Sequence, residues 1–228
     1  MPSPPGWELL RLREPPATFH ARELPSPAQR AVWVCEPTSA ALVLGSAQRD
    51  DVVDAAACER GGVTVVRRRS GGGAVLVVPG ELLWVDVVLP AGDPLWDDDV
   101  GRAFLWLGEA WAAALADLGV AASVHRGGLE VTRWSPLVCF GGVGPGEVLA
   151  TSGTDAGAKL VGLSQRRTRD AARFQCAALA RWDPAALLAL LALSPDARTA
   201  AEADLIGAAA GVGTDLEPLL DALLTHLP

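Results

Sequence analysis

Lysine is almost absent from this chain of 228 residues. Of the 19 basic residues only Lys159 is a lysine and all the others are arginine, and tyrosine is missing altogether. Acidic residues outnumber basic ones and give a formal net charge of −8, so the chain is a poor general binder of nucleic acid or of an anionic membrane. Because 50% of the residues are hydrophobic and the charges are scattered, the composition excludes a disordered chain and indicates a globular protein.

Signals for export, metal binding and disulfide formation are also missing. The first residues, Met1–Leu10, lack a basic segment followed by an apolar core, and no apolar run is long enough to span a bilayer. Cys35, Cys58, Cys139 and Cys176 form no Cys-x-x-Cys pair and lie apart from the three histidines, which argues against a zinc site. We therefore expect a cytoplasmic protein whose thiols are reduced, with at least two of the four buried and Cys176 in the core.

Strand patterns dominate the middle of the chain. We interpret residues 1–228 as one domain and expect the proline-rich residues 1–30 to wrap its surface. Apolar runs predict strands, and acidic starts followed by helical spacing predict helices. The strands are expected at Ala31–Glu36, Ala41–Gly45, Val63–Arg67 and Leu82–Leu89, and the helices at Asp50–Arg60 and Asp97–Leu118.

The second half changes from strands to helices. Short strands with glycine turns are expected from Val120 to about Ala180, and helices follow Asp183 with breaks near Ser194-Pro195 and Gly211–Thr214. Since turns rather than helical crossovers join many of the strands, the pattern favours an α+β fold. Its sheet should be mixed, mostly antiparallel and flanked by helices.

The segment Arg67–Val75 reads RRRSGGGAV and lies between two apolar strands. Its glycines, Gly71, Gly72 and Gly73, allow close approach of the backbone to a ligand, and their amides can form an anion nest. Arg67 supplies bidentate donors for a carboxylate or phosphate, and Ser70 adds a hydroxyl. The segment matches neither a P-loop nor a Rossmann fingerprint, and a flexible hairpin with solvated arginines is the alternative.

The lone lysine opens a second segment, Lys159–Arg167, which reads KLVGLSQRR. Its alternation predicts a strand, and Gly162 removes a side chain where a ligand could approach. A lysine ammonium is a compact charge suited to a carboxylate or a phosphoryl oxygen. The alternative is an exposed lysine on an edge strand.

A third segment joins a thiol to a glycine-rich loop and an acidic residue. Cys139 would act as a nucleophile if nearby cations favoured its thiolate, or it is a small buried apolar residue. Glu147 follows the glycines of 141–146 and would contact a metal–phosphate group, position the lysine, or lie solvated in a turn.

Together, LVLGSAQ at 42–48, RRRSGGGAV and KLVGLSQRR resemble the lipoate–protein ligase A family and its octanoyltransferase relatives, over roughly residues 31–184. The resemblance implies the catalytic fold shared with biotin–protein ligases, although the glycine motif of the biotin enzymes, GRGRxG, is missing. It also implies that the glycine loop wraps an acyl group and its activated phosphate, and that the lysine contacts the acyl carboxylate and the α-phosphate. The implied site comprises Arg67, Ser70, Gly71, Gly72, Gly73, Lys159 and Gly162, with Glu147 as the acidic position and Gln48 and Gln165 as polar positions of the same pocket.

The sequence departs from the family pattern after the glycine loop. The family usually has an aromatic residue followed by His-Asp, and here Leu76, Val77 and Val78 are all apolar. The chain also stops about where the catalytic domain should, so the resemblance implies that the accessory domain of longer ligases comes from another polypeptide or is not needed.

Three functions follow from the resemblance. The favoured one is a lipoate–protein ligase that uses ATP with Mg²⁺, and no tightly bound cofactor, to transfer lipoate or octanoate as a lipoyl-adenylate. The acceptors would be lipoyl domains of 2-oxoacid dehydrogenases or the glycine-cleavage H protein. The second is an octanoyltransferase that takes its acyl group from acyl-carrier protein through Cys139, which lies 20 residues before Lys159. The third is a non-catalytic lipoyl-binding relative.

Overall fold

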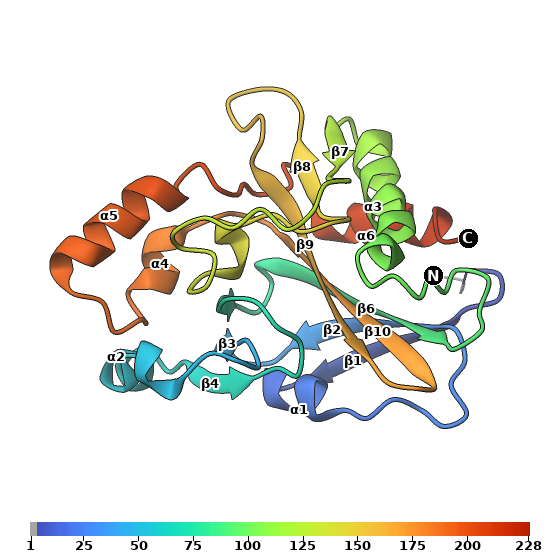
Figure 1. The fold of residues 1–228 in the computed structure, drawn as a ribbon, viewed down its shortest axis with the longest axis horizontal. Coiled ribbons are helices and arrows are strands. Elements are labelled where there is room, and N and C mark those ends of the chain that lie inside the picture. Colours follow the sequence, from blue (N-terminus) through green and yellow to red (C-terminus); the bar gives the residue numbers. More distant parts are fainter. Residues whose placement is uncertain (1–3) are drawn as a thin grey trace.

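The computed structural model describes residues 4–228 and contains two β-sheets (Figure 1). The large sheet has seven strands in the order β1-β2-β6-β10-β9-β8-β7, and only the pairing of β1 with β2 is parallel. Its strands are β1 (Glu8–Glu14), β2 (Ala31–Pro37), β6 (Leu82–Pro90), β7 (Ala122–Val124), β8 (Val148–Ala150), β9 (Lys159–Arg167) and β10 (Ala171–Leu179).

The small sheet has the order β4-β3-β5, with β4 parallel and β5 antiparallel to the central strand. Its strands are β3 (Ala41–Leu44), β4 (Thr64–Arg67) and β5 (Val75–Val77). Both sheets are therefore mixed and the large one is mostly antiparallel, as the sequence predicts.

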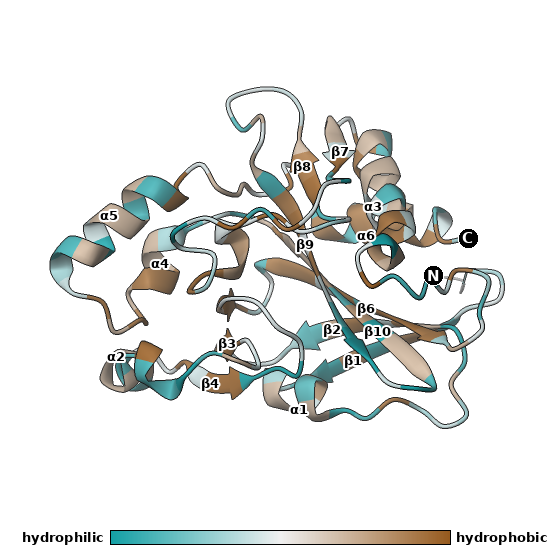
Figure 2. Cartoon of the chain, in the orientation of Figure 1, coloured by the Kyte–Doolittle hydropathy of each residue, from teal (hydrophilic) through white to brown (hydrophobic). Residues whose placement is uncertain are grey.

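Helices pack around both sheets. They are α1 (Pro16–Ala21), α2 (Ala55–Arg60), α3 (Leu105–Asp117), α4 (Pro184–Leu188), α5 (Pro195–Leu205) and α6 (Leu216–Thr225). Helices α3 and α6 pack on each other and on the large sheet, where they enclose the largest apolar cluster. Figure 2 shows the matching concentration of apolar residues along β6 and β8. Among residues 4–228, no helix combines the length and the apolar character needed to cross a bilayer.

Two of the predicted helices begin later than expected because aspartate side chains cap turns. The Asp54 carboxylate accepts a hydrogen bond from the Ala57 amide, so α2 begins after it, and only a short 3-10 turn covers Asp50–Val52. The Asp99 carboxylate likewise accepts from the amides of Gly101 and Arg102, which delays α3. Aspartates that precede a helical pattern thus favour turns over a longer helix.

The N-terminal segment forms regular secondary structure. Residues Glu8–Glu14 form an edge strand paired with β2 along their whole length, and α1 buries Phe19 and His20. The alternation of exposed and partly buried residues in ELLRLRE is the period-two pattern of such a strand. Residues 1–3 of the predicted wrap lie outside the described residues.

Candidate functional site

An apolar slot opens where the two sheets meet. Its walls come from β3 and β5 of the small sheet and from β6, β9 and β10 of the large sheet. Apolar side chains dominate the lining: Val43, Val75, Val77, Leu82, Trp84, Phe140, Leu163, Cys176 and Ala177. The remaining lining residues are His20, Arg68, Cys139, Gly162, Ser164 and Gln175. A lining of this composition suits an apolar chain with a few polar contacts.

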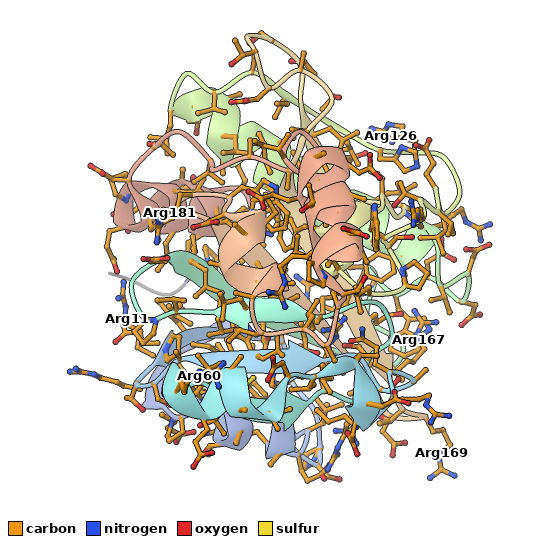
Figure 3. All side chains as sticks on the ribbon, turned by 90° about the vertical axis from the view of Figure 1, so that its left-hand side faces the viewer. Arg11, Arg60, Arg126, Arg167, Arg169 and Arg181 are labelled. Carbon is orange, nitrogen blue, oxygen red and sulfur yellow. The ribbon has the colours of Figure 1, made fainter. Side chains whose placement is uncertain are left out.

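Lys159 is buried, which rules out the exposed edge-strand alternative. Its side chain is 1% exposed, whereas Arg60, Arg126 and Arg169 extend from the surface of the molecule (Figure 3). The Lys159 Nζ lies 2.7 Å from Glu147 Oε2 and donates a hydrogen bond to the Cys139 carbonyl at 3.0 Å. The ammonium also lies 5.3 Å from the centre of the Phe140 ring. It sits behind the Cys139-Phe140 segment rather than in the lining of the slot.

Glu147 holds this lysine in place. Its Oε2 also accepts from the Gly144 amide at 2.7 Å, and its Oε1 accepts from the Leu163 amide at 3.1 Å. Both oxygens are engaged within the protein, which is the arrangement of a positioning residue rather than of a metal ligand. Within residues 4–228, no group of three or more His, Cys, Asp or Glu side chains could hold a metal ion.

The triple glycine allows one backbone segment to lie against another. Gly72 adopts a φ of +95°, and a Cβ built on Gly73 would lie 2.5 Å from the Val138 backbone. The next residue, Ala74, donates its amide to the Leu137 carbonyl and accepts from the Cys139 amide. Gly71 has open space around its Cα. The glycine loop is therefore fastened to the segment that carries Cys139, and Gly71 is its open end.

Arg68, and not the predicted Arg67, lines the slot. The guanidinium of Arg67 turns away and donates to the carbonyls of Gly45 and Gln48 and to the Asp50 carboxylate. Arg68 is buried and donates to the carbonyls of Gly71 and Gly73. Sequence reasoning missed this residue, although the strand alternation that buries Val66 also buries Arg68.

The two predicted glutamines have different places. The Gln48 side chain accepts from the Gly45 amide and donates to the carbonyls of Pro136 and Leu137. It therefore clamps the two loops beside the slot. Gln165 lies on β9, one residue beyond Ser164, outside the lining, and its buried amide atoms have no hydrogen-bond partner among residues 4–228.

Cys139 and Phe140 form one wall of the slot. Gly162 makes room for the ring of Phe140, because a Cβ there would lie 3.2 Å from Phe140 Cζ. Cys139 is partly exposed and lines the slot, whereas the other three cysteines are buried. Burial raises the pKa of each of these three thiols, which keeps them protonated and weakly nucleophilic. The expectation that Cys176 is buried is confirmed.

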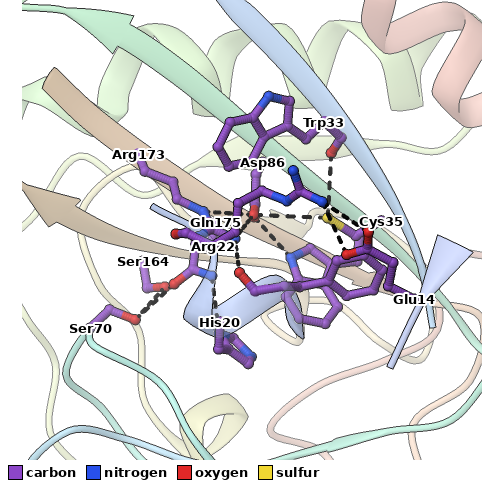
Figure 4. Close-up of polar contacts among 12 residues, drawn as sticks. Glu14, His20, Arg22, Trp33, Cys35, Ser70, Asp86, Ser164, Arg173 and Gln175 are labelled. Atoms are coloured by element: carbon purple, nitrogen blue, oxygen red, sulfur yellow. Dashed lines mark hydrogen bonds and ion pairs between the residues drawn. The ribbon is translucent and has the colours of Figure 1, made fainter. Parts of the chain in front are cut away.

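A polar chain crosses the slot wall away from Cys139, and of its members only Ser70 was predicted from the sequence (Figure 4). The Ser70 hydroxyl lies 3.2 Å from the Ser164 hydroxyl and 3.1 Å from Gln175 Oε1. The Gln175 Nε2 lies 3.4 Å from Nδ1 of His20, which comes from α1. Burial, together with the charges of Arg173 and Arg68, lowers the pKa of His20 to about 3, so its imidazole is neutral near pH 7.

Helix α1 is held against the slot by a second buried ion pair. The guanidinium of Arg173 donates to the Asp86 carboxylate, to the carbonyl of Phe19 at 2.8 Å and to that of Arg22 at 3.2 Å. The Asp86 carboxylate also accepts from the Trp84 indole at 2.8 Å. These contacts fix α1, and with it His20, to strands β6 and β10 (Figure 4).

Comparisons with known proteins identify a matching family and similar structures. A model of the family described as "Lipoyl protein ligase A/B catalytic domain" matches residues 18–224. No curated protein sequence matches the chain. Among solved structures, a bi-partite lipoate protein ligase from Thermoplasma acidophilum superposes with a TM-score of 0.73 and 20% identity, over 96% of this chain and 81% of that one.

Two further structures carry ligands. Protein Ta0514 of T. acidophilum, with bound lipoic acid, gives a TM-score of 0.68 and 19% identity over 96% of this chain and 83% of that one. A lipoate-protein ligase A bound with ATP gives a TM-score of 0.66 and 22% identity, over 95% of this chain and 81% of that one. At these identities the likeness establishes a shared fold.

Proposed function

Because the chain belongs to the lipoyl protein ligase A/B catalytic-domain family, we propose that it attaches a lipoyl or octanoyl group to a lysine of a lipoyl domain through an acyl-adenylate. The observation that carries this proposal is the apolar slot, which ends beside the buried Lys159–Glu147 pair. The ligands of two structural neighbours, lipoic acid and ATP, support the same substrates here.

The proposed reaction has two steps. In the first, a carboxylate oxygen of the acid attacks the α-phosphorus of ATP, the bond to the β-phosphate breaks, and pyrophosphate leaves with the Mg²⁺ that accompanied ATP. In the second, the acceptor amine attacks the acyl carbon, the bond to AMP breaks, and the amine loses a proton. The slot would hold the acyl chain during both steps, which keeps the carboxyl group in one place.

Lys159 would stabilise the negative charge on the carboxylate and the α-phosphate in this reaction. Its ammonium has three N–H donors, and within the described residues two polar groups accept from it, Glu147 and the Cys139 carbonyl. One donor therefore remains for a ligand, and displacement of the Cys139 carbonyl would release a second. The open Gly71 end of the glycine loop would contact the activated phosphate.

Lipoate-dependent exchange of labelled pyrophosphate into ATP tests the first step in isolation. We expect exchange that requires both lipoate and Mg²⁺. If no exchange occurs while an apo lipoyl domain is acylated from an acyl-carrier thioester, the adenylate route is wrong.

The position of Cys139 favours a second candidate function, transfer of octanoate from a carrier thioester. The Cys139 sulfur would attack the thioester carbonyl and release the carrier thiol. The acceptor amine would then attack the acyl-enzyme and release the Cys139 thiolate. Intact-mass measurement after incubation with octanoyl-acyl-carrier protein should then show one octanoyl adduct, which Cys139→Ser loses. An unchanged transfer rate in Cys139→Ser would exclude this route.

A further inference from the structure

Strand register gives the slot two distinct ends. Along β9, Lys159 comes first, Gly162 follows beside Phe140, and Ser164 lies further on. On the neighbouring strand, Ala177 pairs with Gly162 and Gln175 pairs with Ser164. Because a strand advances about 3.3 Å per residue, the Ser164–Gln175 pair lies roughly 7 Å from the Gly162–Ala177 pair. An acyl chain whose carboxyl group lies near Lys159 and Cys139 therefore extends its tail toward Gln175 and His20.

The tail end is polar, which an ordinary alkyl chain would not require. Ser70, Ser164, Gln175 and His20 meet there, and all but Ser70 line the slot. Buried polar groups are costly in an apolar wall unless they are satisfied, so their placement at one end indicates contact with a ligand atom.

The hydrogen bonds assign the proton of the His20 imidazole. Gln175 Oε1 accepts from Ser70, so the Gln175 amide nitrogen faces His20 and donates to Nδ1. A neutral imidazole then carries its proton on Nε2. Within the part of the chain that the structure describes, the imidazole forms no other hydrogen bond, and its ring packs on Trp84 at 4.8 Å. The Nε2–H group is therefore available to a ligand.

We propose that His20 is a specificity-determining residue, whose Nε2–H recognises a polarisable, weakly accepting group at the distal end of the acyl chain. This inference rests on the proposed function and refines its substrate. The dithiolane sulfurs of a lipoyl group accept weak hydrogen bonds and are polarisable, whereas the terminal methyl of an octanoyl group would cover the N–H without satisfying it. The slot should therefore prefer lipoate to octanoate, two acids that share the same chain length.

Calorimetric titration of lipoate and of octanoate into the purified protein, without ATP, tests this preference directly. We expect the wild type to bind lipoate more tightly than octanoate. His20→Phe keeps an aromatic ring against Trp84 but removes the donor, and should reduce the lipoate-to-octanoate affinity ratio roughly threefold to tenfold. His20→Gln retains an N–H donor and should preserve the ratio.

His226→Phe is the matched control, because His226 pairs with Asp117 on the surface, away from the slot. It should leave the ratio unchanged. If His20→Phe loses its cooperative melting transition, Gln175→Leu takes its place in the experiment. This change removes the hydrogen bond that keeps the His20 proton on Nε2, leaves the sequence of α1 unaltered, and should lower the ratio. An unchanged ratio in a folded His20→Phe variant would overturn the inference alone. Binding of neither acid by the wild type would overturn the proposed function and the inference with it.

Discussion

The two buried ion pairs beside the slot have similar burial but different surroundings. At the carboxyl end, the side chains of Lys159 and Glu147 are 1% and 5% exposed, and at the tail end those of Arg173 and Asp86 are 2% and 0% exposed. The guanidinium of Arg173 donates to a carboxylate and to two carbonyls near α1. Within the described residues, the ammonium of Lys159 uses two of its three donors, and one of them contacts a carbonyl of the loop that lines the slot.

Under the proposed function, this difference separates a structural pair from a functional one. A planar guanidinium that donates to groups of two elements fixes these elements to each other, and its rearrangement would break several hydrogen bonds together. A compact ammonium with a spare donor can contact a ligand without leaving its carboxylate. The chain uses arginine for nearly all of its positive charges, and its only lysine lies where the proposed reaction needs such a compact ammonium.

The largest expected effect is on the structural pair. Asp86→Asn removes the charge that compensates a buried guanidinium, so we expect the free energy of unfolding to fall by about 3–5 kcal/mol. Chemical denaturation monitored by tryptophan fluorescence measures this loss. If the loss were below 1 kcal/mol, the Arg173–Asp86 pair would not be what holds α1 in place.

Lys159→Arg is the corresponding test of the functional pair. We expect acyl transfer to an apo lipoyl domain to fall roughly 100-fold or more, because a guanidinium cannot reproduce the geometry of the ammonium. The circular dichroism spectrum should remain that of the wild type. If the variant transferred acyl groups at the wild-type rate, Lys159 would have to be removed from the proposed site.

Glu147 should show a smaller, graded effect, because it acts through the lysine. Glu147→Gln leaves the Lys159 ammonium buried without its counter-ion and should reduce acyl transfer roughly 10-fold to 100-fold. Glu147→Asp keeps the negative charge and should recover part of this activity. Equal loss in the two variants would indicate that the carboxylate charge has no role beyond packing.

The smallest expected effect is a change in pH dependence at the tail end. The folded-state pKa of His20 is lowered to about 3, so below the usual pKa near 6.5 the unfolded chain binds a proton that the folded chain does not. Stability therefore falls as pH decreases from about 6.5 toward 3, by about 1 kcal/mol per pH unit from this residue. His20→Phe should flatten the fall seen in denaturation curves between pH 6.5 and 5. An identical slope in the variant would show that the imidazole is not buried as a neutral group.

The sequence was most informative where the pattern is local. The strand that begins at Lys159, the glycines at 71–73 and the mostly antiparallel sheet follow from periodicity and from the resemblance, and the family resemblance is confirmed. Arg68 could have been predicted in the same way, since strand alternation places its side chain on the buried face and that of Arg67 on the exposed face. The resemblance led to Arg67 instead, which turns out to brace the Gly45–Gln48 loop.

Other parts of the site depend on contacts between distant segments. His20 comes from a short helix in a proline-rich stretch, and contacts with distant residues such as Arg173 and Gln175 hold it at the slot. The space that Gly162 leaves, where the sequence suggests a ligand, holds the Phe140 ring. Glu147, which the sequence suggests as a metal contact, forms an ion pair with Lys159. Local patterns cannot reveal these pairings, because they are made by the packing of strands that are far apart in sequence.

We propose that the slot and Lys159 together acylate a lipoyl domain. The most direct measurement is the intact mass of an apo lipoyl domain after incubation with the protein, once with ATP, Mg²⁺ and lipoate and once with octanoyl-acyl-carrier protein. We expect one lipoyl adduct on the domain in the first incubation, and its loss with Lys159→Arg. No acyl adduct from either source would contradict it.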